Sequence, residues 1–221
     1  MSKLLSEFAA LDNFSELYCA VRGQLRCTAI RLRTGGLCLF SPVQGLGEEA
    51  IASLADLGEV EVLLAPNHYH NKGLRECAKA FPKSLICASK GAASRLESVT
   101  GMRIEGLGKL RPLLRSNTKL VAPSGLKTGE VWISASGIDA RAWVVVDAFC
   151  GPSGNKDTSA TEPSILGTFP RFGIADRQVY LQWLERQIEL DNPTVIVPCH
   201  GAVVRSRRLS SAIRRLVGSK L

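Results

Sequence analysis

The stretch VEVLLAPNHYHNKGLRE, residues 60–76, joins a run of apolar residues to two of the chain's three histidines. Its first part has the composition of a buried strand, and Pro66 is expected to end that strand. His68 and His70 follow two residues apart. On an extended segment, side chains at positions i and i+2 point to the same face, so both imidazoles could reach one ion. Neutral imidazole is a good ligand for zinc or iron.

Two later segments have the same form, an apolar strand that ends in a polar residue. The run AWVVVD places Asp147 at its end, and TVIVPCH places His200 at its end. Each histidine alone is more typical of a hydrogen-bonded loop or core residue than of a metal ligand. The joint pattern favours a metal site, because a carboxylate adds negative charge that helps to hold a cation. We expect His68, His70, Asp147 and His200 to meet at one edge of the fold.

The remaining pattern predicts strands first and then strands that alternate with helices. Strands are expected at 17–23, 27–43 (a hairpin broken at Gly35 and Gly36), 60–65, 84–88, 130–134, 142–149 and 194–198. Helices are expected at 47–58, 72–81, 91–99, 175–190 and in the C-terminal segment after the residues CHG. The stretch 101–129 shows no clear pattern. This order favours two sheets enclosed by helices, an α/β class, in a single domain over residues 1–221.

Composition narrows the function classes. The longest apolar runs fall short of the roughly 20 residues that span a bilayer, so no membrane association is expected. The N-terminus lacks the apolar core of a secretory signal, and the seven cysteines contain no CxxC pair. Both features favour reduced thiols and a cytoplasmic location.

The net charge is +8, and the residues after His200 include six cations and no acid. One interpretation is an anionic partner such as nucleic acid. The alternative, which we favour because no nucleic-acid motif accompanies the charge, is an amphipathic terminal helix with Leu209, Ile213, Leu216 and Val217 on one face.

The segments HYHNKG, VVVDAF and VPCHG resemble, in order and position, the metal motifs of the metallo-β-lactamase superfamily. The resemblance runs from about residue 27 to the C-terminus and implies a four-layer αβ/βα sandwich. In that family the first motif is HxHxDH, a later aspartate bridges two metals, and a final histidine precedes glycine. Asp147 and His200 match the last two positions. The segments TAIRLRTGGLCLFSPV and APN also resemble an uncharacterised bacterial subgroup of that fold.

The departures from the motif are as informative as the matches. Lys72 stands where the family has the aspartate of HxHxDH, and Gly73 stands where it has the last histidine. No histidine lies between His70 and His200, so the family's separate histidine is also missing. The resemblance assigns His68, His70 and Asp147 to the first metal and leaves only Asp147 and His200 for the second. It therefore implies at most one zinc, iron or manganese ion.

Two functions from different classes follow. One is a mononuclear metal-dependent hydrolase with a degenerate site, and the family suggests an ester, thioester, lactone or phosphoester as its small-molecule substrate. The other is a metal-free, catalytically inactive relative that binds a ligand or a partner. Nucleic-acid processing is a third and weaker hypothesis. The oligomeric state has no signature in the sequence.

Three further features bear on the site. Lys72 could turn into the vacant second-metal position, offset the charge of Asp147 and anchor an anionic substrate group; the alternative is that it begins the next helix and points to water. Cys150 and Cys199 could supply soft ligands, although small buried residues are the more common case. The loop 151–170 is typical of a lid or binding surface and equally of a disordered segment.

Overall fold

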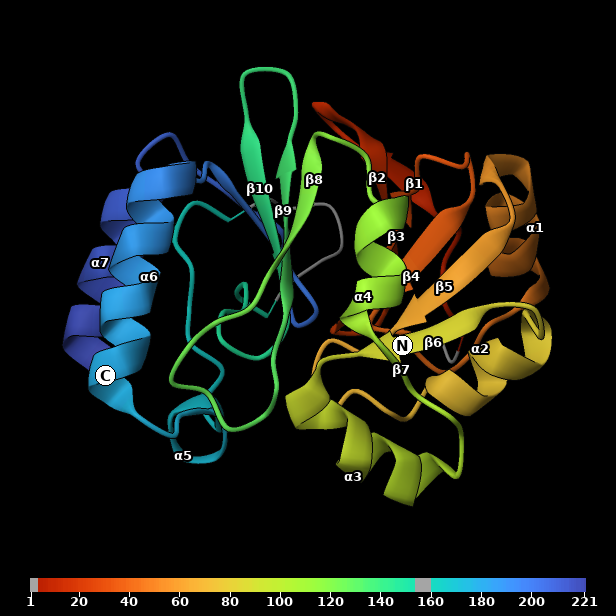
Figure 1. Ribbon diagram of the computed structural model, residues 1–221. Coiled ribbons are helices and arrows are strands. Elements are labelled where there is room, and N and C mark those ends of the chain that lie inside the picture. Colours follow the sequence, from red (N-terminus) through yellow and green to blue (C-terminus); the bar gives the residue numbers. More distant parts are fainter. Residues whose placement is uncertain (1–3, 154–159) are drawn as a thin grey trace.

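The computed structural model describes residues 4–153 and 160–221. Within them the strands form two sheets, one ordered β1-β2-β3-β4-β5-β6-β7 and the other β12-β11-β10-β9-β8 (Figure 1). The first sheet contains β1 (Ala9–Leu11), β2 (Phe14–Arg22), β3 (Leu25–Arg31), β4 (Leu37–Phe40), β5 (Val60–Leu64), β6 (Leu85–Ala88) and β7 (Glu105–Gly106). The second contains β8 (Thr118–Val121), β9 (Trp132–Ser136), β10 (Arg141–Val145), β11 (Val195–Pro198) and β12 (Val204–Arg205).

Helices cover the outer face of each sheet. In Figure 1 the order from left to right is α6 with α7, the sheet that holds β8 to β10, the sheet that holds β2 to β6, and α1 with α2. The helices are α1 (Glu48–Leu57), α2 (Leu74–Ala80), α3 (Lys90–Thr100), α4 (Leu107–Leu110), α5 (Phe169–Gly173), α6 (Arg177–Asp191) and α7 (Leu209–Lys220), with a 3₁₀ turn η1 (Arg111–Leu113). The α/β sandwich of four layers is therefore confirmed.

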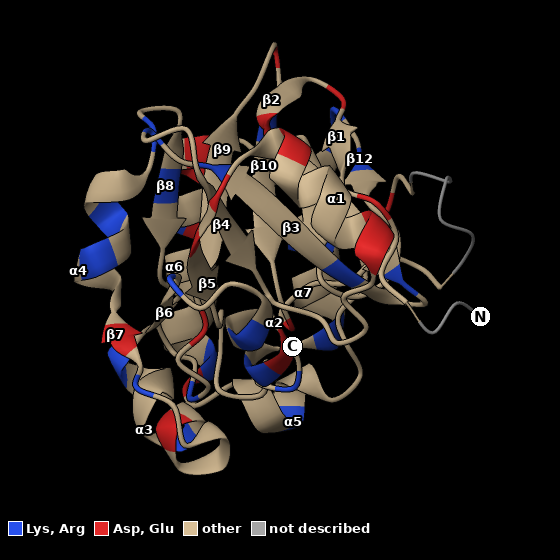
Figure 2. Ribbon diagram, turned by 90° about the vertical axis from the view of Figure 1, so that its right-hand side faces the viewer, with Lys and Arg blue, Asp and Glu red and all other residues tan. Residues whose placement is uncertain are grey.

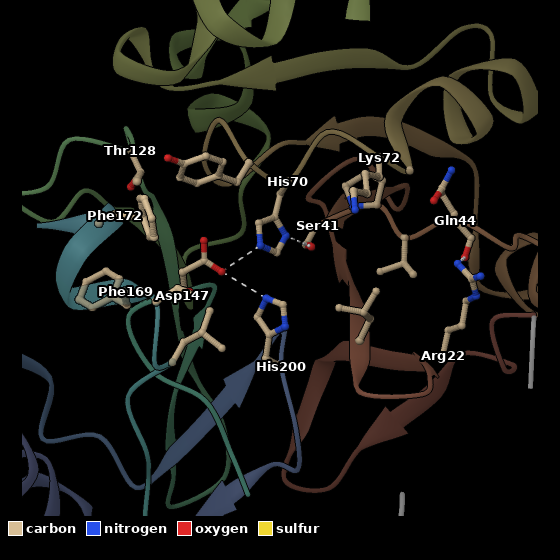
Figure 3. Close-up of a pocket in the computed structure, with 18 residues that line it drawn as sticks. Arg22, Ser41, Gln44, His70, Lys72, Thr128, Asp147, Phe169, Phe172 and His200 are labelled. Carbon is tan, nitrogen blue, oxygen red and sulfur yellow. Dashed lines mark hydrogen bonds and ion pairs between the residues drawn. The ribbon is translucent and has the colours of Figure 1, made fainter. Parts of the chain in front are cut away.

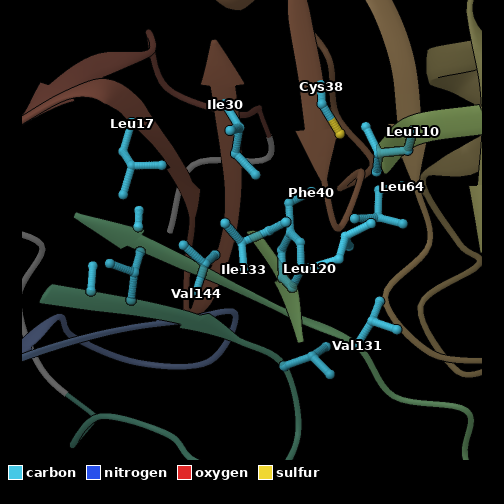
Figure 4. Close-up of a cluster of buried hydrophobic side chains, with 14 of the residues drawn as sticks. Leu17, Ile30, Cys38, Phe40, Leu64, Leu110, Leu120, Val131, Ile133 and Val144 are labelled. Atoms are coloured by element: carbon cyan, nitrogen blue, oxygen red, sulfur yellow. The ribbon is translucent and has the colours of Figure 1, made fainter. Parts of the chain in front are cut away.

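Three buried clusters fill the three interfaces between these layers. The central cluster lies between the sheets, where Phe40 and Leu64 of the first face Ile133 and Val144 of the second (Figure 4). A second cluster packs the first sheet against α1, α2 and α3. The third packs the second sheet against α5, α6 and α7 and contains the fully buried Trp143. Burial of apolar surface at these interfaces stabilises the sandwich.

Strand β5, which precedes His68 and His70, is buried on both faces. β5 lies between β4 and β6 and is parallel to both. Val62 and Leu64 face the other sheet, whereas Leu63 faces the outer helices. A central parallel strand is covered on both sides, so its sequence reads as a continuous apolar run.

The sequence predicted the main strands and helices and missed several of the shortest elements. The hairpin at Gly35 and Gly36 is confirmed as the antiparallel pair β3–β4. The stretch 101–129, left without an assignment, contains β7, α4, η1 and the edge strand β8. β1, β12 and α5 were not predicted either. β1 and β12 have three and two residues, and α5 is a five-residue helix that contains Pro170, so none of them shows the continuous apolar run that indicates a strand such as β11.

The basic C-terminal segment forms the amphipathic helix α7. Its buried face includes Leu209, Ile213 and Val217, and two of its arginines pair with acids, Arg214 with Glu185 and Arg215 with Glu162. Figure 2 shows charge spread over the molecule, with acidic residues on α1 and basic residues on α4. In the described part of the chain, no helix combines the length and apolarity that crossing a membrane requires.

Candidate metal centre

Three of the four residues predicted from the sequence meet at one place. His70 lies in the turn after β5, Asp147 lies two residues after β10, and His200 lies two residues after β11. β10 and β11 are parallel neighbours, so their carboxyl ends lie side by side and deliver Asp147 and His200 to the same edge. The turn after β5 reaches this edge from the other sheet.

The geometry of these three residues suits a single ion. Nε2 of His70 lies 3.1 Å and Nε2 of His200 lies 3.2 Å from the same carboxylate oxygen, Oδ1 of Asp147 (Figure 3). One ligand atom from each residue lies within 4.8 Å of the others. Tetrahedral ligands about 2.0–2.1 Å from a zinc ion lie roughly 3.3 Å from one another. The donor set and its spacing therefore fit one zinc-like ion.

Asn67 explains why His70 is in this group and His68 is not. Its side-chain carbonyl accepts hydrogen bonds from the backbone N–H of Tyr69 at 2.8 Å and of His70 at 3.2 Å. This is the local turn that asparagine side chains favour. The segment after Pro66 is therefore not extended, and the expectation that His68 and His70 point the same way is wrong.

His68 lies outside the group of ligand atoms. Its ring meets Tyr69 edge to face, with ring centroids 4.3 Å apart. Burial, together with the positive charge of Arg95, lowers the pKa of His68 and favours its neutral form. The structure thus groups one histidine from the first motif with Asp147 and His200, whereas the resemblance assigned those positions to two different metals.

Hydrogen bonds fix the orientation of the Asp147 carboxylate and of the His70 ring. The side-chain amide of Asn67, which is fully buried, donates to Oδ2 of Asp147 at 2.7 Å. This bond leaves Oδ1 facing the histidines. On the other side of His70, Nδ1 shares a 2.7 Å hydrogen bond with Oγ of Ser41. Such contacts set the tautomer and orientation of a ligating histidine.

The loop that carries His200 is held by the first sheet. The backbone N–H of Arg26 in β3 donates to the carbonyl of Cys199 at 2.9 Å, and that of Gly201 donates to Gln24 at 2.9 Å. The buried guanidinium of Arg26 donates to the carbonyls of Pro198 at 3.4 Å and Gly201 at 3.1 Å. The two sheets are therefore joined directly beneath the candidate centre.

A second carboxyl group lies behind Asp147. Glu130 is buried, and its Oε1 accepts hydrogen bonds from the indole of Trp132 at 2.7 Å and from the backbone N–H of Ala148 at 3.3 Å. Burial, reinforced by the negative charge of Asp147, raises the pKa of Glu130 to about 8. The protonated form of Glu130 is therefore favoured in the folded protein.

The pKa of Asp147 is shifted in the opposite direction. Its burial alone would raise its pKa, but hydrogen bonds from His200, His70 and Asn67 hold that pKa well below the usual range. The carboxylate is ionised and faces two imidazoles, which is the charge state that cation binding needs.

Lys72 and Gly73 stand where the resemblance has the last two residues of HxHxDH. Lys72 lines the cavity beside the centre. Among the residues that the structure describes, it forms no ion pair with Asp147. The donors that face Asp147 are the histidines and Asn67 instead. At Gly73 an added Cβ would collide with the backbone carbonyl of Pro42. A histidine cannot be restored at this position without moving the loop after β4.

A cavity of about 490 Å³ opens above the three residues. Apolar and aromatic side chains dominate its wall, which is typical of small-molecule sites. The lining includes Leu166, Thr168 and Phe169, so the end of the loop 151–170 contributes to the cavity, while residues 154–159 of that loop lie outside the described residues.

The two candidate thiols are not part of the group of ligand atoms. Burial raises the pKa of Cys150 and of Cys199, so both thiols stay protonated at neutral pH. Cys199 is buried, and Cys150 is half-buried.

Sequence reasoning missed Ser41, Asn67, Arg26 and Glu130. Asn67 alone carried a local signal, because asparagine after proline at a strand end is a turn former. The other three act through partners far away in the chain.

Comparison with known proteins identifies similar folds among solved structures. No family model matches the sequence, and no curated protein sequence matches it significantly. Among solved structures, a metallo-β-lactamase from Pontibacter korlensis has a TM-score of 0.61 at 13% identity, over 98% of this chain and 100% of that one. A metallo-β-lactamase from Hirschia baltica has a TM-score of 0.65 at 9% identity, over 97% and 98% of the two chains.

A third similar structure is the metal-soaked Flv1 flavodiiron core from Synechocystis sp. PCC6803, with a TM-score of 0.59 at 13% identity. The match covers 97% of this chain and 62% of that one. These identities are low, so the likeness concerns architecture. Together with the two sheets and their outer helices, it shows that this chain has the metallo-β-lactamase fold.

Proposed function

We propose that the chain is a mononuclear metal-dependent hydrolase that acts on a small organic substrate. The observation that carries the proposal is the meeting of three ligand atoms from three separate segments beneath a cavity of about 490 Å³. His70, Asp147 and His200 would hold the ion. A divalent ion held there would polarise a substrate oxygen and activate water.

The chain's own residues prepare this site in two ways. A proton on Nδ1 of His70 can donate to Ser41, which leaves the Nε2 lone pair facing the ion. The amide of Asn67 occupies Oδ2 of Asp147 and leaves Oδ1 free for coordination. With only three protein ligands, positions stay open for water and substrate, as in catalytic rather than structural zinc sites.

The competing function is metal-free ligand binding, and one observation favours it. Each of the two histidines is within hydrogen-bond distance of Asp147, so N–H groups of their rings could satisfy the carboxylate without an ion. The cavity would then serve binding alone.

The test is hydrolysis by tag-free protein that has been stripped with a chelator and reloaded with zinc, manganese or iron(II). A carboxylic ester, a thioester, a lactone and a phosphodiester would be assayed in parallel. We expect metal-dependent hydrolysis of at least one class, with at least a hundredfold loss in Asp147→Asn.

The matched control is Asp139→Asn, the same substitution in an exposed loop, which should keep full activity. Hydrolysis that is unaffected by chelation would refute the metal-dependent mechanism. Reloaded, folded protein that hydrolyses none of the four classes would favour the binding function instead.

A further inference from the structure

The cavity wall carries an excess of positive charge. Apart from the histidines, its ionisable lining groups are Arg22, Lys72, Tyr69 and Asp147. Asp147 already faces His70, His200 and Asn67. Within the described residues, neither Arg22 nor Lys72 forms an ion pair with an acid; the guanidinium of Arg22 donates to the backbone carbonyl of Gln44 at 3.0 Å. The mostly apolar cavity is therefore lined by two cations, and the carboxylate that it contains, Asp147, pairs with the histidines rather than with them.

Two aromatic rings of the cavity wall are exposed. Tyr69 and Phe172 are 42% and 45% exposed, and each lies beneath a guanidinium, that of Arg95 or Arg171, 5.3 Å from the ring centroid. Cations over these rings add positive potential near the cavity. The rings themselves provide flat apolar surface that a ligand could cover.

The charged and the apolar features lie on opposite sides of the candidate centre. In Figure 3, Lys72 and Arg22 lie on one side of His70, and Phe169 and Phe172 lie on the other. A ligand that used both sides would cross the centre. Its anionic end would be near Lys72 and its apolar end near the phenylalanines.

We propose that the cavity binds an amphipathic organic anion, a molecule with an aromatic or aliphatic body and one carboxylate or phosphate group. As a statement about substrate it rests on the proposed hydrolase function. Binding itself uses the cavity wall and does not need the ion, so it can be measured on metal-free protein.

The experiment is calorimetric titration of chelator-treated protein with four probes: 4-phenylbutyrate, phenyl phosphate, the neutral 4-phenylbutyramide and acetate. We expect at least one aromatic anion to bind at least tenfold more tightly than both the amide and acetate. Preference for 4-phenylbutyrate would identify a carboxylate ligand, and preference for phenyl phosphate would identify a phosphate ligand.

Two variants test the charged side and the aromatic side of the cavity separately. Lys72→Met should weaken the aromatic anion at least fivefold and leave the amide unchanged, because only the charged contact is lost. Phe172→Ala should weaken both. Lys109→Met on α4 is the matched control and should change neither, with circular dichroism confirming that each variant is folded.

Equal affinity for the anion and the amide, or an unchanged anion affinity in folded Lys72→Met, would overturn the proposal. So would the absence of binding by all four probes. Because the titration uses metal-free protein, these results are independent of whether the hydrolase proposal holds.

Discussion

At the scale of single residues, the candidate centre separates two carboxyl groups by environment. Asp147 faces two imidazoles and an amide donor and stays ionised. Glu130 lies behind it, buried, and its pKa is raised to about 8. A protonated Glu130 can lie close to the Asp147 carboxylate because it adds no second negative charge.

Titration of Glu130 makes the free energy of unfolding depend on pH. The pKa of Glu130 is higher in the folded protein than the ordinary value of 4.5. The folded state therefore binds the proton more tightly, and the stabilisation it gives is full below about pH 4.5 and is lost as the pH rises towards about 8.

Glu130→Gln should remove this dependence, since glutamine has nearly the same shape and does not titrate. Relative to the parent, the variant's free energy of unfolding should rise between about pH 5 and 8, by at most about 1.4 kcal/mol per pH unit. Urea denaturation at pH 5, 6.5 and 8 measures the difference, and other titrating groups largely cancel. A pH-independent difference would show that Glu130 is ionised in the folded state.

At the scale of elements, β3 of the first sheet positions the loop after β11 of the second. Arg26→Met keeps the length and apolar stem of the side chain but leaves the carbonyls of Pro198 and Gly201 without this donor. We expect the free energy of unfolding to fall by about 1–3 kcal/mol.

The matched control for Arg26→Met is Arg22→Met at the end of the neighbouring strand. Arg22 also donates to a backbone carbonyl, that of Gln44, but in an exposed position. Its loss should change the free energy of unfolding by less than about 0.5 kcal/mol. Equal effects in chemical denaturation would mean that the contact with the His200 loop adds no stability.

The position of each site residue in its strand or loop explains whether it could be predicted from the sequence. Asp147 and His200 each follow an apolar strand, and residues just after the strands of such a fold gather at one edge, so their convergence could be foreseen. The error at His68 arose because its segment was taken as extended. One side-chain carbonyl, that of Asn67, turns the chain there. Ser41 and Arg26 contact the site across the sandwich, and no local pattern records such contacts.

At the scale of the whole molecule, the sandwich was predictable because its main strands and helices bury long apolar faces. The short edge strands depend on pairing with their neighbours rather than on their own sequence. The same packing limits the site. The backbone of Pro42 fills the space beside Gly73, so a side chain at position 73 would require this loop to move.

We propose that His70, Asp147 and His200 together hold one metal ion. Calorimetric titration of zinc into tag-free, chelator-treated protein tests it directly. We predict one ion per chain, with binding lost in His70→Ala and in His200→Ala and retained in the matched variant His68→Ala. Absence of binding, two ions per chain, or an equal loss of affinity in His68→Ala would contradict a single ion site formed by these three residues.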